Sequence, residues 1–220
     1  MNRTQIMTAS LMLLCSRCAL ADPVFFDDFD GDDLKPWWSK SPPNFWKYTV
    51  ADSLLKVTYL KEFSASIGTK FDPLSGDSEA RAAMGWAESN GYDQEFSFAI
   101  SGDASWLASF GFTEKMGDYV VRVSVPGGPY LKFPAPPPGI HDFAILRQAG
   151  EFHFVLDDRL LAVLPDSSGD PITKVGFHFT AVGPIDPLLI DRVQVVPPPG
   201  AMALLLGGAC MAARRTRRTL

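Results

Sequence analysis

The sequence predicts an all-β fold, an antiparallel β-sandwich formed by residues 22–196 of the 220-residue chain. Apolar and polar residues alternate with a period of two along most of this segment, which is typical of strands with one face on a core and one toward water. Clusters of glycine, proline, asparagine and aspartate recur at short intervals, as expected for turns between the short strands of a sandwich or barrel. No stretch carries the apolar stripe of an amphipathic helix.

The alternation places the strands in chain order. Aromatic-rich strands are expected at Phe96–Ile100 and Phe110–Phe112, and a valine-rich strand is expected at Val121–Val125. A hairpin is expected within Phe143–Leu156, where glycine follows the first strand. The proline-rich segment Pro134–Gly139 could join two domains, but neither half has enough alternating strands to close a sandwich. We therefore interpret it as an extended loop within one domain.

Residues 1–21 have the features of a secretory signal peptide. Arg3 provides the positive start, an uncharged apolar stretch follows, and Ala19 and Ala21 form the small-x-small pattern that signal peptidase recognises. Cleavage there would leave Asp22 as the new N-terminus, so the sequence predicts an exported protein.

Residues 197–220 form a third segment, made of a proline hinge, an apolar stretch and a basic end. We expect a short apolar helix that associates with a membrane transiently or terminally. At about 1.5 Å per residue, a helix over Ala201–Ala213 is roughly 20 Å long, shorter than the ~30 Å hydrocarbon core of a membrane. The alternative interpretation is a terminal helix of the folded domain. The prolines are Pro197, Pro198 and Pro199, and the arginines are Arg214, Arg215, Arg217 and Arg218.

This order of hinge, apolar segment and arginines resembles the PEP-CTERM sorting signal of exopolysaccharide-producing Gram-negative bacteria. Pro197–Pro199 stands where that signal has Pro-Glu-Pro, so whether the tail is cleaved stays open. The resemblance implies an exosortase-like membrane protease as partner, and the cell envelope or extracellular matrix as destination.

Cysteine usage and charge restrict the function classes. Cys15, Cys18 and Cys210 all lie outside residues 22–196, so this segment has no disulfide and no thiol nucleophile. Residues 22–200 contain all 25 acidic residues and 14 of the 20 basic ones, a net charge near −11 (14 − 25). Such a body is not drawn to nucleic acid or to anionic lipid.

Three stretches resemble the concanavalin A-like jelly rolls, the laminin-G-like and glucanase-like family. Phe26–Leu34 with Trp37-Trp38 and Trp46–Val57 is similar to the family's opening strands, His141–Asp158 to its paired strands, and Leu188–Val195 to its closing strand. The resemblance implies a jelly-roll sandwich. Its glucanase members hydrolyse sugars with two neighbouring carboxylates.

The motifs of catalysis are absent from the sequence. No glutamate begins a Glu-x-Asp-x-x-Glu glucanase signature, no Gly-x-Ser-x-Gly elbow occurs, and His141, His153 and His178 lack metal-ligand spacing. The acidic run Asp27–Asp33 could attract Ca²⁺, but it lacks the EF-hand pattern and is interpreted as a solvated edge. We expect no metal and no cofactor, and the missing motifs argue against enzyme activity.

Aromatic residues are the remaining candidates for a binding site. Trp38, Tyr92 and Tyr130 lie near expected turns and are predicted to form a carbohydrate-stacking platform, whereas Trp46, Trp86 and Trp106 are expected in the core. The main hypothesis is a non-catalytic surface or matrix protein that associates with extracellular polysaccharide. A divergent glycoside-active enzyme and a purely structural envelope protein are the alternatives.

Overall fold

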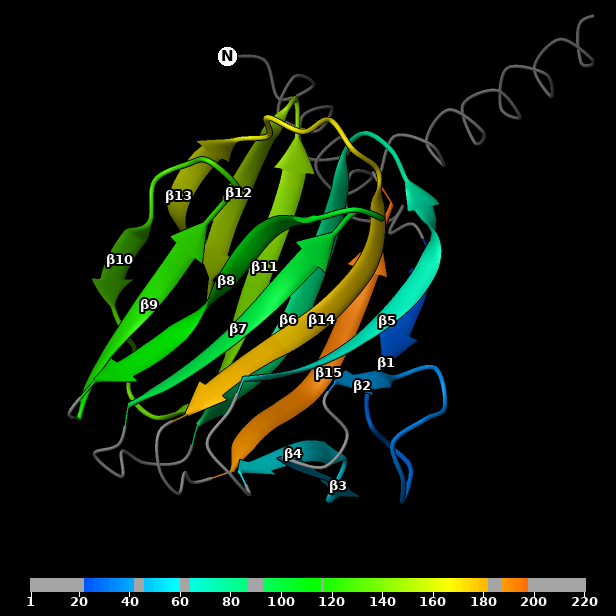
Figure 1. Cartoon of the computed structure of the whole chain (residues 1–220), viewed down its shortest axis with the longest axis vertical. Coiled ribbons are helices and arrows are strands. Elements are labelled where there is room, and N and C mark those ends of the chain that lie inside the picture. Colours follow the sequence, from blue (N-terminus) through cyan, green and yellow to red (C-terminus); the bar gives the residue numbers. More distant parts are fainter. Residues whose placement is uncertain are drawn as a thin grey trace, which may run out of the picture.

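The computed structural model describes residues 22–41, 46–59, 64–86, 93–115, 117–181 and 187–197. Two antiparallel sheets pack face to face (Figure 1), which confirms the predicted all-β sandwich. The predicted signal peptide with Ala19 and Ala21, the tail from Pro198 through Arg214 and Arg215, and Tyr92 lie outside the described residues. Within the described ranges, no helix is long and apolar enough to cross a membrane.

The eight-stranded sheet forms one layer. Its order is β13 (Arg159–Pro165), β12 (Glu151–Leu156), β11 (Gly139–Gln148), β6 (Ser78–Trp86), β15 (Leu188–Val196), β4 (Leu54–Tyr59) and β3 (Trp46–Ala51), and β1 (Phe25–Asp27) also pairs with β15. The seven-stranded sheet forms the other layer, in front in Figure 1. Its order is β10 (Leu131–Pro134), β9 (Asp118–Ser124), β8 (Trp106–Lys115), β7 (Gln94–Ser101), β14 (Ile172–Ala181), β5 (Ala65–Leu74) and β2 (Ser39–Ser41).

Alternate aromatic residues of the two sheets meet between the layers. Phe110 of β8 packs edge-on against Phe143 and Phe154 of the opposite sheet, with ring centroids 4.8 and 5.6 Å apart. All three rings are fully buried. Each such burial contributes roughly 1.5–3 kcal/mol, so the period-two pattern of the sequence is also the main source of stability.

Two of the three tryptophans expected in the core are there. Trp46 and Trp86 are 2% and 1% exposed, as predicted. Trp106 is 42% exposed, so its predicted burial is wrong. It opens β8 opposite Ser101, where a register shift in the pairing with β7 turns it toward solvent.

The acidic run before β2 is only partly the solvated edge expected from the sequence. Asp28 and Asp30 have exposed carboxylates, but Asp27 is fully buried and the prediction is wrong for it. Asp27 accepts hydrogen bonds from the Phe29 amide (3.0 Å) and the Trp38 indole (2.8 Å), and the Lys35 ammonium lies 3.0 Å away. A buried carboxylate needs such partners, so Asp27 organises the N-terminal corner.

The segment Pro134–Gly139 connects the two sheets. It leads from β10 in the seven-stranded sheet to β11 in the eight-stranded sheet, where β11 pairs with β6. His141 lies at its end, with one ring nitrogen 2.7 Å from Asp157 Oδ2 and the other 2.8 Å from the Pro137 carbonyl oxygen. The segment is therefore tied to the sandwich.

Candidate functional site

The outer face of the seven-stranded sheet carries unusually small side chains. Because side chains alternate across a strand, the phenylalanines of β7, β8 and β14 point inward and the residues between them point outward. The register aligns these outward residues into rows that cross the strands, and the central rows consist mostly of serine, alanine and glycine: Ser97, Ala99, Ser109, Gly111, Ser124, Gly176 and Gly68. Two hollows lie on this face.

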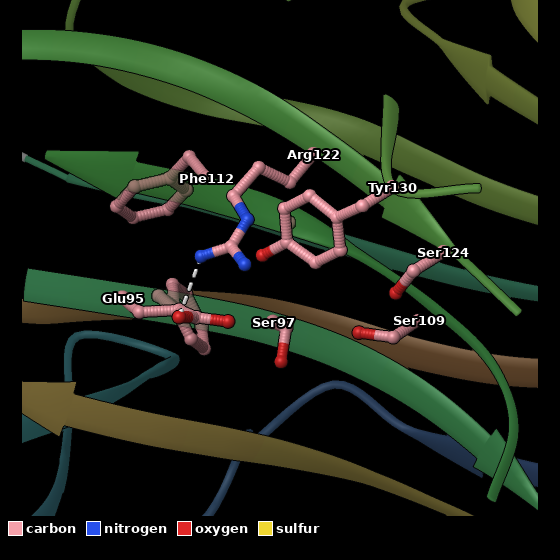
Figure 2. A pocket seen from close by; sticks show the side chains of 9 residues that line it. Glu95, Ser97, Ser109, Phe112, Arg122, Ser124 and Tyr130 are labelled. Carbon is pink, nitrogen blue, oxygen red and sulfur yellow. Dashed lines mark hydrogen bonds and ion pairs between the residues drawn. The ribbon is translucent and has the colours of Figure 1, made fainter. Parts of the chain in front are cut away.

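The first hollow, here called the arginine hollow, is built around Arg122 of β9 (Figure 2). The Arg122 guanidinium reaches across β8 to Glu95 of β7, with Nη1 2.6 Å from Oε2, and also donates to Thr113 Oγ1 at 2.8 Å. Gly111 belongs to β8, the strand between β9 and β7, and it has no side chain that would block the Arg122 side chain on its way to Glu95. The space is only about 10 Å³, roughly one water molecule, so the hollow is a polar notch.

Tyr130 covers the arginine hollow from the loop before β10. The Arg122 guanidinium carbon lies 3.8 Å from the centre of the Tyr130 ring, a cation–π geometry visible in Figure 2. Tyr130 is 46% exposed and lies beside the turn at Gly127, so its predicted exposure is confirmed. Arg122 Nε is buried and has no hydrogen-bond acceptor among the described residues.

The second hollow, here called the glycine hollow, lies across β5, β14 and β7. Gly68 and Gly176 are direct cross-strand partners, and Ala99 continues their row on β7. The hollow measures about 240 Å³, a little below the ~300–1,000 Å³ of small-molecule pockets. It therefore suits a small part of an extended ligand.

Polar side chains line the walls of the glycine hollow. Ser66 and His178 form one side, and Ser101 and Lys174 form the other. The exposed ring of Trp106 is the cross-strand neighbour of Ser101 and so extends this second wall. Hydroxyls and a cation thus surround a floor of small residues, and the exposed Trp106 lies next to Ser101.

Carboxylates are scarce on the central part of this face. Among the outward positions of the described strands β8, β7 and β14, Glu95 is the one carboxylate, and Arg122 neutralises it. The described residues contain no group of three or more histidines, cysteines, aspartates or glutamates that could hold a metal ion.

The opposite face of the molecule carries a self-contained ion network. Arg81 lies 2.7 Å from both Glu79 and Asp142, and Arg192 lies 3.8 Å from Asp142. These charges neutralise one another across β6, β11 and β15, so the network is better suited to holding strands together than to binding a ligand.

The predicted aromatic platform is only partly present. Tyr130 lies on the outer face, but Trp38 is 5% exposed and its predicted exposure is wrong. The Trp38 ring packs between Phe29 and Phe177, and its indole nitrogen is held by Asp27. Tyr92 lies outside the described residues.

The sequence interpretation missed the glycine hollow, Arg122 and Trp106. A usable signal was present, because a glycine inside a strand often marks a place where a ligand or another backbone approaches closely. Gly68, Gly111 and Gly176 all interrupt otherwise regular strands. The signal shows neither which strands become neighbours nor which glycines share a row.

No protein-family model and no curated protein matches the sequence. Solved structures do match. The CBM2 module of the evolved Dit of Lactobacillus casei BL23 phage J-1 aligns with a TM-score of 0.64 at 11% identity, over 80% of this chain and 95% of that chain. An endo-β-1,3-glucanase from Pyrococcus furiosus aligns with a TM-score of 0.61 at 12% identity, over 80% and 94%. The Crh5 transglycosylase aligns with a TM-score of 0.61 at 16% identity, over 81% and 86%.

These similarities show the fold alone, because the identities are low. The fold is that of the glucanase-like jelly rolls, as the resemblance to concanavalin A-like proteins implied.

Proposed function

We propose that this protein is an exported, non-catalytic carbohydrate-binding protein of the cell surface or extracellular matrix. It binds polysaccharide along the outer face of the seven-stranded sheet. The observation that carries the proposal is the glycine hollow, a trough floored by Gly68, Gly176 and Ala99, walled by the hydroxyl groups of Ser66 and Ser101, and with the exposed Trp106 as the cross-strand neighbour of Ser101.

The chemistry of this face suits a sugar chain. Flat aromatic rings with a polar edge stack on sugar rings. Tyr130, in the loop before β10, and Trp106, at the start of β8, present such rings at different places on the same sheet. Serine hydroxyls between them can both donate to and accept from sugar hydroxyls. The similar solved structures include a glucanase and a transglycosylase, which is consistent with a sugar ligand on this fold.

The same face supports a binding role over hydrolysis. A retaining glycosidase needs two carboxyl groups about 5 Å apart. The described outward positions of β8, β7 and β14 provide Glu95 alone, and it is held in an ion pair.

Export and sorting complete the proposal. Residues 1–21 and 197–220 would act as a signal peptide and a PEP-CTERM-like tail processed by an exosortase-like protease. The amide of Val24 donates to the carbonyl of Val195 (2.9 Å), and Phe25 pairs with Val195 in the sheet. Both proposed processing points therefore flank neighbouring strands at one place on the sandwich. Pro197 follows β15, so cleavage beyond it would remove none of the described strands.

Affinity electrophoresis tests the binding role. The protein purified from its host is run in gels with and without the host's exopolysaccharide, and we expect retardation in the polysaccharide gel. Ala99→Leu should reduce retardation several-fold, because its side chain fills the glycine hollow from a position that already has a Cβ. Tyr130→Ala should weaken it as well, since stacking on an aromatic ring contributes about 0.5–1.5 kcal/mol.

Phe26→Ala is the matched control. Phe26 is 47% exposed, close to the 46% of Tyr130, but it belongs to β1 of the other sheet. Its removal should leave the retardation unchanged. The proposal fails if the wild-type protein is not retarded, or if the outer-face variants are retarded as strongly as wild type. Release of reducing sugar from the polysaccharide by the protein would instead support the divergent-enzyme alternative.

Intact mass tests the sorting role. A secreted species that begins at Asp22 and ends between Pro197 and Ala201 is the expected product. A membrane-bound species that retains Arg214 and Arg215 would show that the tail is a plain anchor.

A further inference from the structure

Two lysines lie at the end of the glycine hollow without a structural reason for being together. Lys70 of β5 and Lys174 of β14 are direct cross-strand partners, in the row next to that of Gly68 and Gly176, and Lys174 lines the hollow. Like charges directly opposite each other destabilise a sheet. The fold therefore gains nothing from this pair.

Neither lysine is neutralised by a carboxylate in the part of the chain that the structure describes. Lys174 Nζ donates to the backbone carbonyl oxygen of Asp103 at 3.2 Å. The Asp103 carboxylate is turned elsewhere and accepts from the Thr173 hydroxyl at 3.1 Å. The two ammonium groups thus remain available to an anion at the wall of the hollow.

The charge of this face is opposite to that of the whole body. Residues 22–200 carry 25 acidic against 14 basic side chains, yet cations predominate on the outward positions of the seven-stranded sheet. These cations are Lys70, Lys115, Arg122, Lys132 and Lys174, against Asp72, Asp118 and the already paired Glu95. A local positive field on an acidic body draws anions to this face.

We infer that the glycine hollow and the Lys70–Lys174 pair bind anionic units of the polysaccharide, sugars that carry a carboxylate or a sulfate. The inference rests on the proposed function and narrows its ligand class. The sugar ring lies over Gly68, Gly176 and Ala99, the anionic group lies between the two ammonium groups, and Ser101 offers a hydroxyl beside them. Both lysines lie on β14 and β5, whereas Tyr130 precedes β10 at the opposite edge of the sheet, so charge and stacking can be tested separately.

Matched polymers test the inference. The full-length protein is titrated in low salt with polygalacturonate, with the same polymer after carboxyl reduction, and with dextran and dextran sulfate. We expect polygalacturonate to bind at least about tenfold more tightly than its reduced form, and the difference to shrink as salt screens the charges. Polyglutamate controls for attraction to any polyanion and should bind weakly.

The double variant Lys70→Gln/Lys174→Gln identifies the site. It should lose about tenfold in affinity for the anionic polymer, since each exposed ion pair is worth a modest amount and two are removed, and it should keep any affinity for the neutral polymer. Its melting temperature should stay equal or rise, because a repulsive pair is relieved. Lys47→Gln/Lys56→Gln removes the same charge from β3 and β4 of the other sheet and should leave binding unchanged.

The outcomes separate this inference from the proposed function. Preference for dextran sulfate over polygalacturonate, lost in the double variant, supports the inference with sulfate as the anionic group. Equal binding of charged and neutral polymers, equal binding of polyglutamate, or an unaffected double variant overturns the inference and leaves polysaccharide binding intact. Failure to bind any of the polymers and the host exopolysaccharide overturns both.

Discussion

Asp27 shows how a charged residue can stabilise the interior of this fold. Its carboxylate is fully buried, and it accepts from one backbone amide and two indoles beside an ammonium. Trp37 and Trp38 thereby anchor the N-terminal corner to the core through a single side chain. The pKa of Lys35 lies above its ordinary value, chiefly because Asp27 accepts a hydrogen bond from its ammonium.

Asp27→Asn is expected to lower the free energy of unfolding by about 3 kcal/mol, because it leaves a buried set of donors without their anion. Urea unfolding followed by tryptophan fluorescence measures the loss. Asp28→Asn is the control, since the neighbouring carboxylate is 46% exposed and should change stability little. Equal effects of the two variants would contradict the structural role of Asp27.

Tyr48 is partly buried, and its buried hydroxyl lowers the stability of the fold, whereas the Asp27 carboxylate raises it. Its hydroxyl oxygen has no hydrogen-bond partner among the described residues, and burial raises its pKa to about 12. Tyr48→Phe should therefore stabilise the protein by about 1 kcal/mol in urea unfolding at pH 7, whereas Tyr130→Phe, on the surface, should have little effect.

The raised pKa of Tyr48 also predicts an alkaline loss of stability. The side chain of Tyr48 loses its proton near pH 10 in the unfolded chain and near pH 12 in the folded one. The free energy of unfolding is therefore unaffected by this ionisation below pH 10 and falls as pH rises from 10 through 12. Tyr48→Phe should flatten the fall of the unfolding free energy between pH 10 and 12. An unchanged slope would contradict the burial of this hydroxyl.

At the scale of elements, two-residue turns close several hairpins through strained positions. Asp157 and Asp158 join β12 to β13 with φ of 48° and 63°, and Asp52 and Ser53 join β3 to β4 with φ of 59° and 56°. Positive φ at both central residues fits the type I′ turn, which matches the twist of the strands. Glycine is absent from both turns although it adopts this conformation most easily.

Asp158→Gly is expected to raise the free energy of unfolding by about 1 kcal/mol, because it removes the cost of a side chain in the left-handed region. The Asp158 side chain is 92% exposed and reaches Arg81 only at 3.9 Å, so little is lost. Thermal unfolding measures the gain. Gly150→Ala, at φ of 80° in the preceding hairpin between β11 and β12, should shift stability in the other direction.

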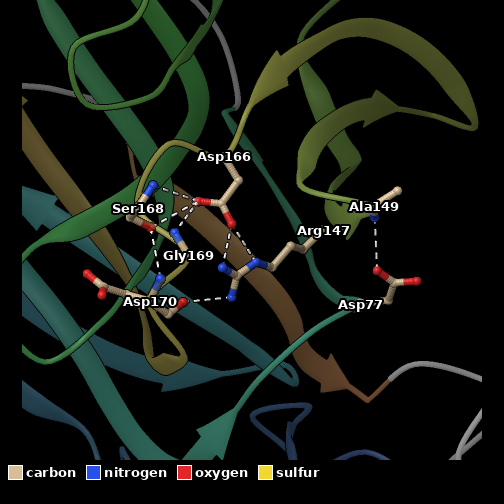
Figure 3. Close-up of polar contacts among 7 residues, drawn as sticks. All are labelled: Asp77, Arg147, Ala149, Asp166, Ser168, Gly169 and Asp170. Carbon is tan, nitrogen blue, oxygen red and sulfur yellow. Dashed lines mark hydrogen bonds and ion pairs between the residues drawn. The ribbon is translucent and has the colours of Figure 1, made fainter.

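Arg147 fixes the connection from one sheet to the other (Figure 3). It extends from the end of β11 to Asp166, and Nη1 also donates to the Asp170 carbonyl oxygen at 2.7 Å. Asp166 in turn accepts from the amide and hydroxyl of Ser168. Burial alone would raise the pKa of Asp166, but the hydrogen bonds from Ser168 and Arg147 together lower it.

Asp166→Asn should cost about 3 kcal/mol of unfolding free energy at pH 7, because Arg147 is left buried without its anion. Since the folded pKa lies below 3.8, the stabilisation is present above pH 3.8 and is lost as pH falls through the folded value. Unfolding from pH 5 to pH 2 measures both effects. Asp170→Asn, in the same turn, keeps its backbone carbonyl and should behave as wild type.

At the scale of the whole molecule, the last strands of the chain occupy central places. β14 lies between β7 and β5, and β15 lies between β6 and β4. A chain ending at Pro165 therefore lacks the link between the halves of both sheets and should not fold, as circular dichroism and limited proteolysis would show. A chain ending at Pro197 keeps all of the described strands and should melt at the temperature of the full-length protein.

Much of the fold could be predicted because its signal is local. The alternation of Phe96, Phe98 and Ile100, or of Val121 and Val123, depends only on the two-residue repeat of a strand, and these side chains are buried as expected. The surface position of Tyr130 is predictable for a similar reason, because the residue lies beside a glycine turn. Local patterns failed at Trp38 and Trp106, whose exposure depends on a distant carboxylate and on a register shift.

The all-β class, the inward face of most strands and the acidic, cysteine-free body could be read from the sequence, because each depends on composition or on neighbours in the chain. The folded sheets alone show that Gly68, Gly176 and Ala99 share one row, that Arg122 meets Glu95 beneath Tyr130, and that Lys70 faces Lys174. Strand order and register bring residues more than a hundred positions apart into contact, and no local periodicity encodes that choice.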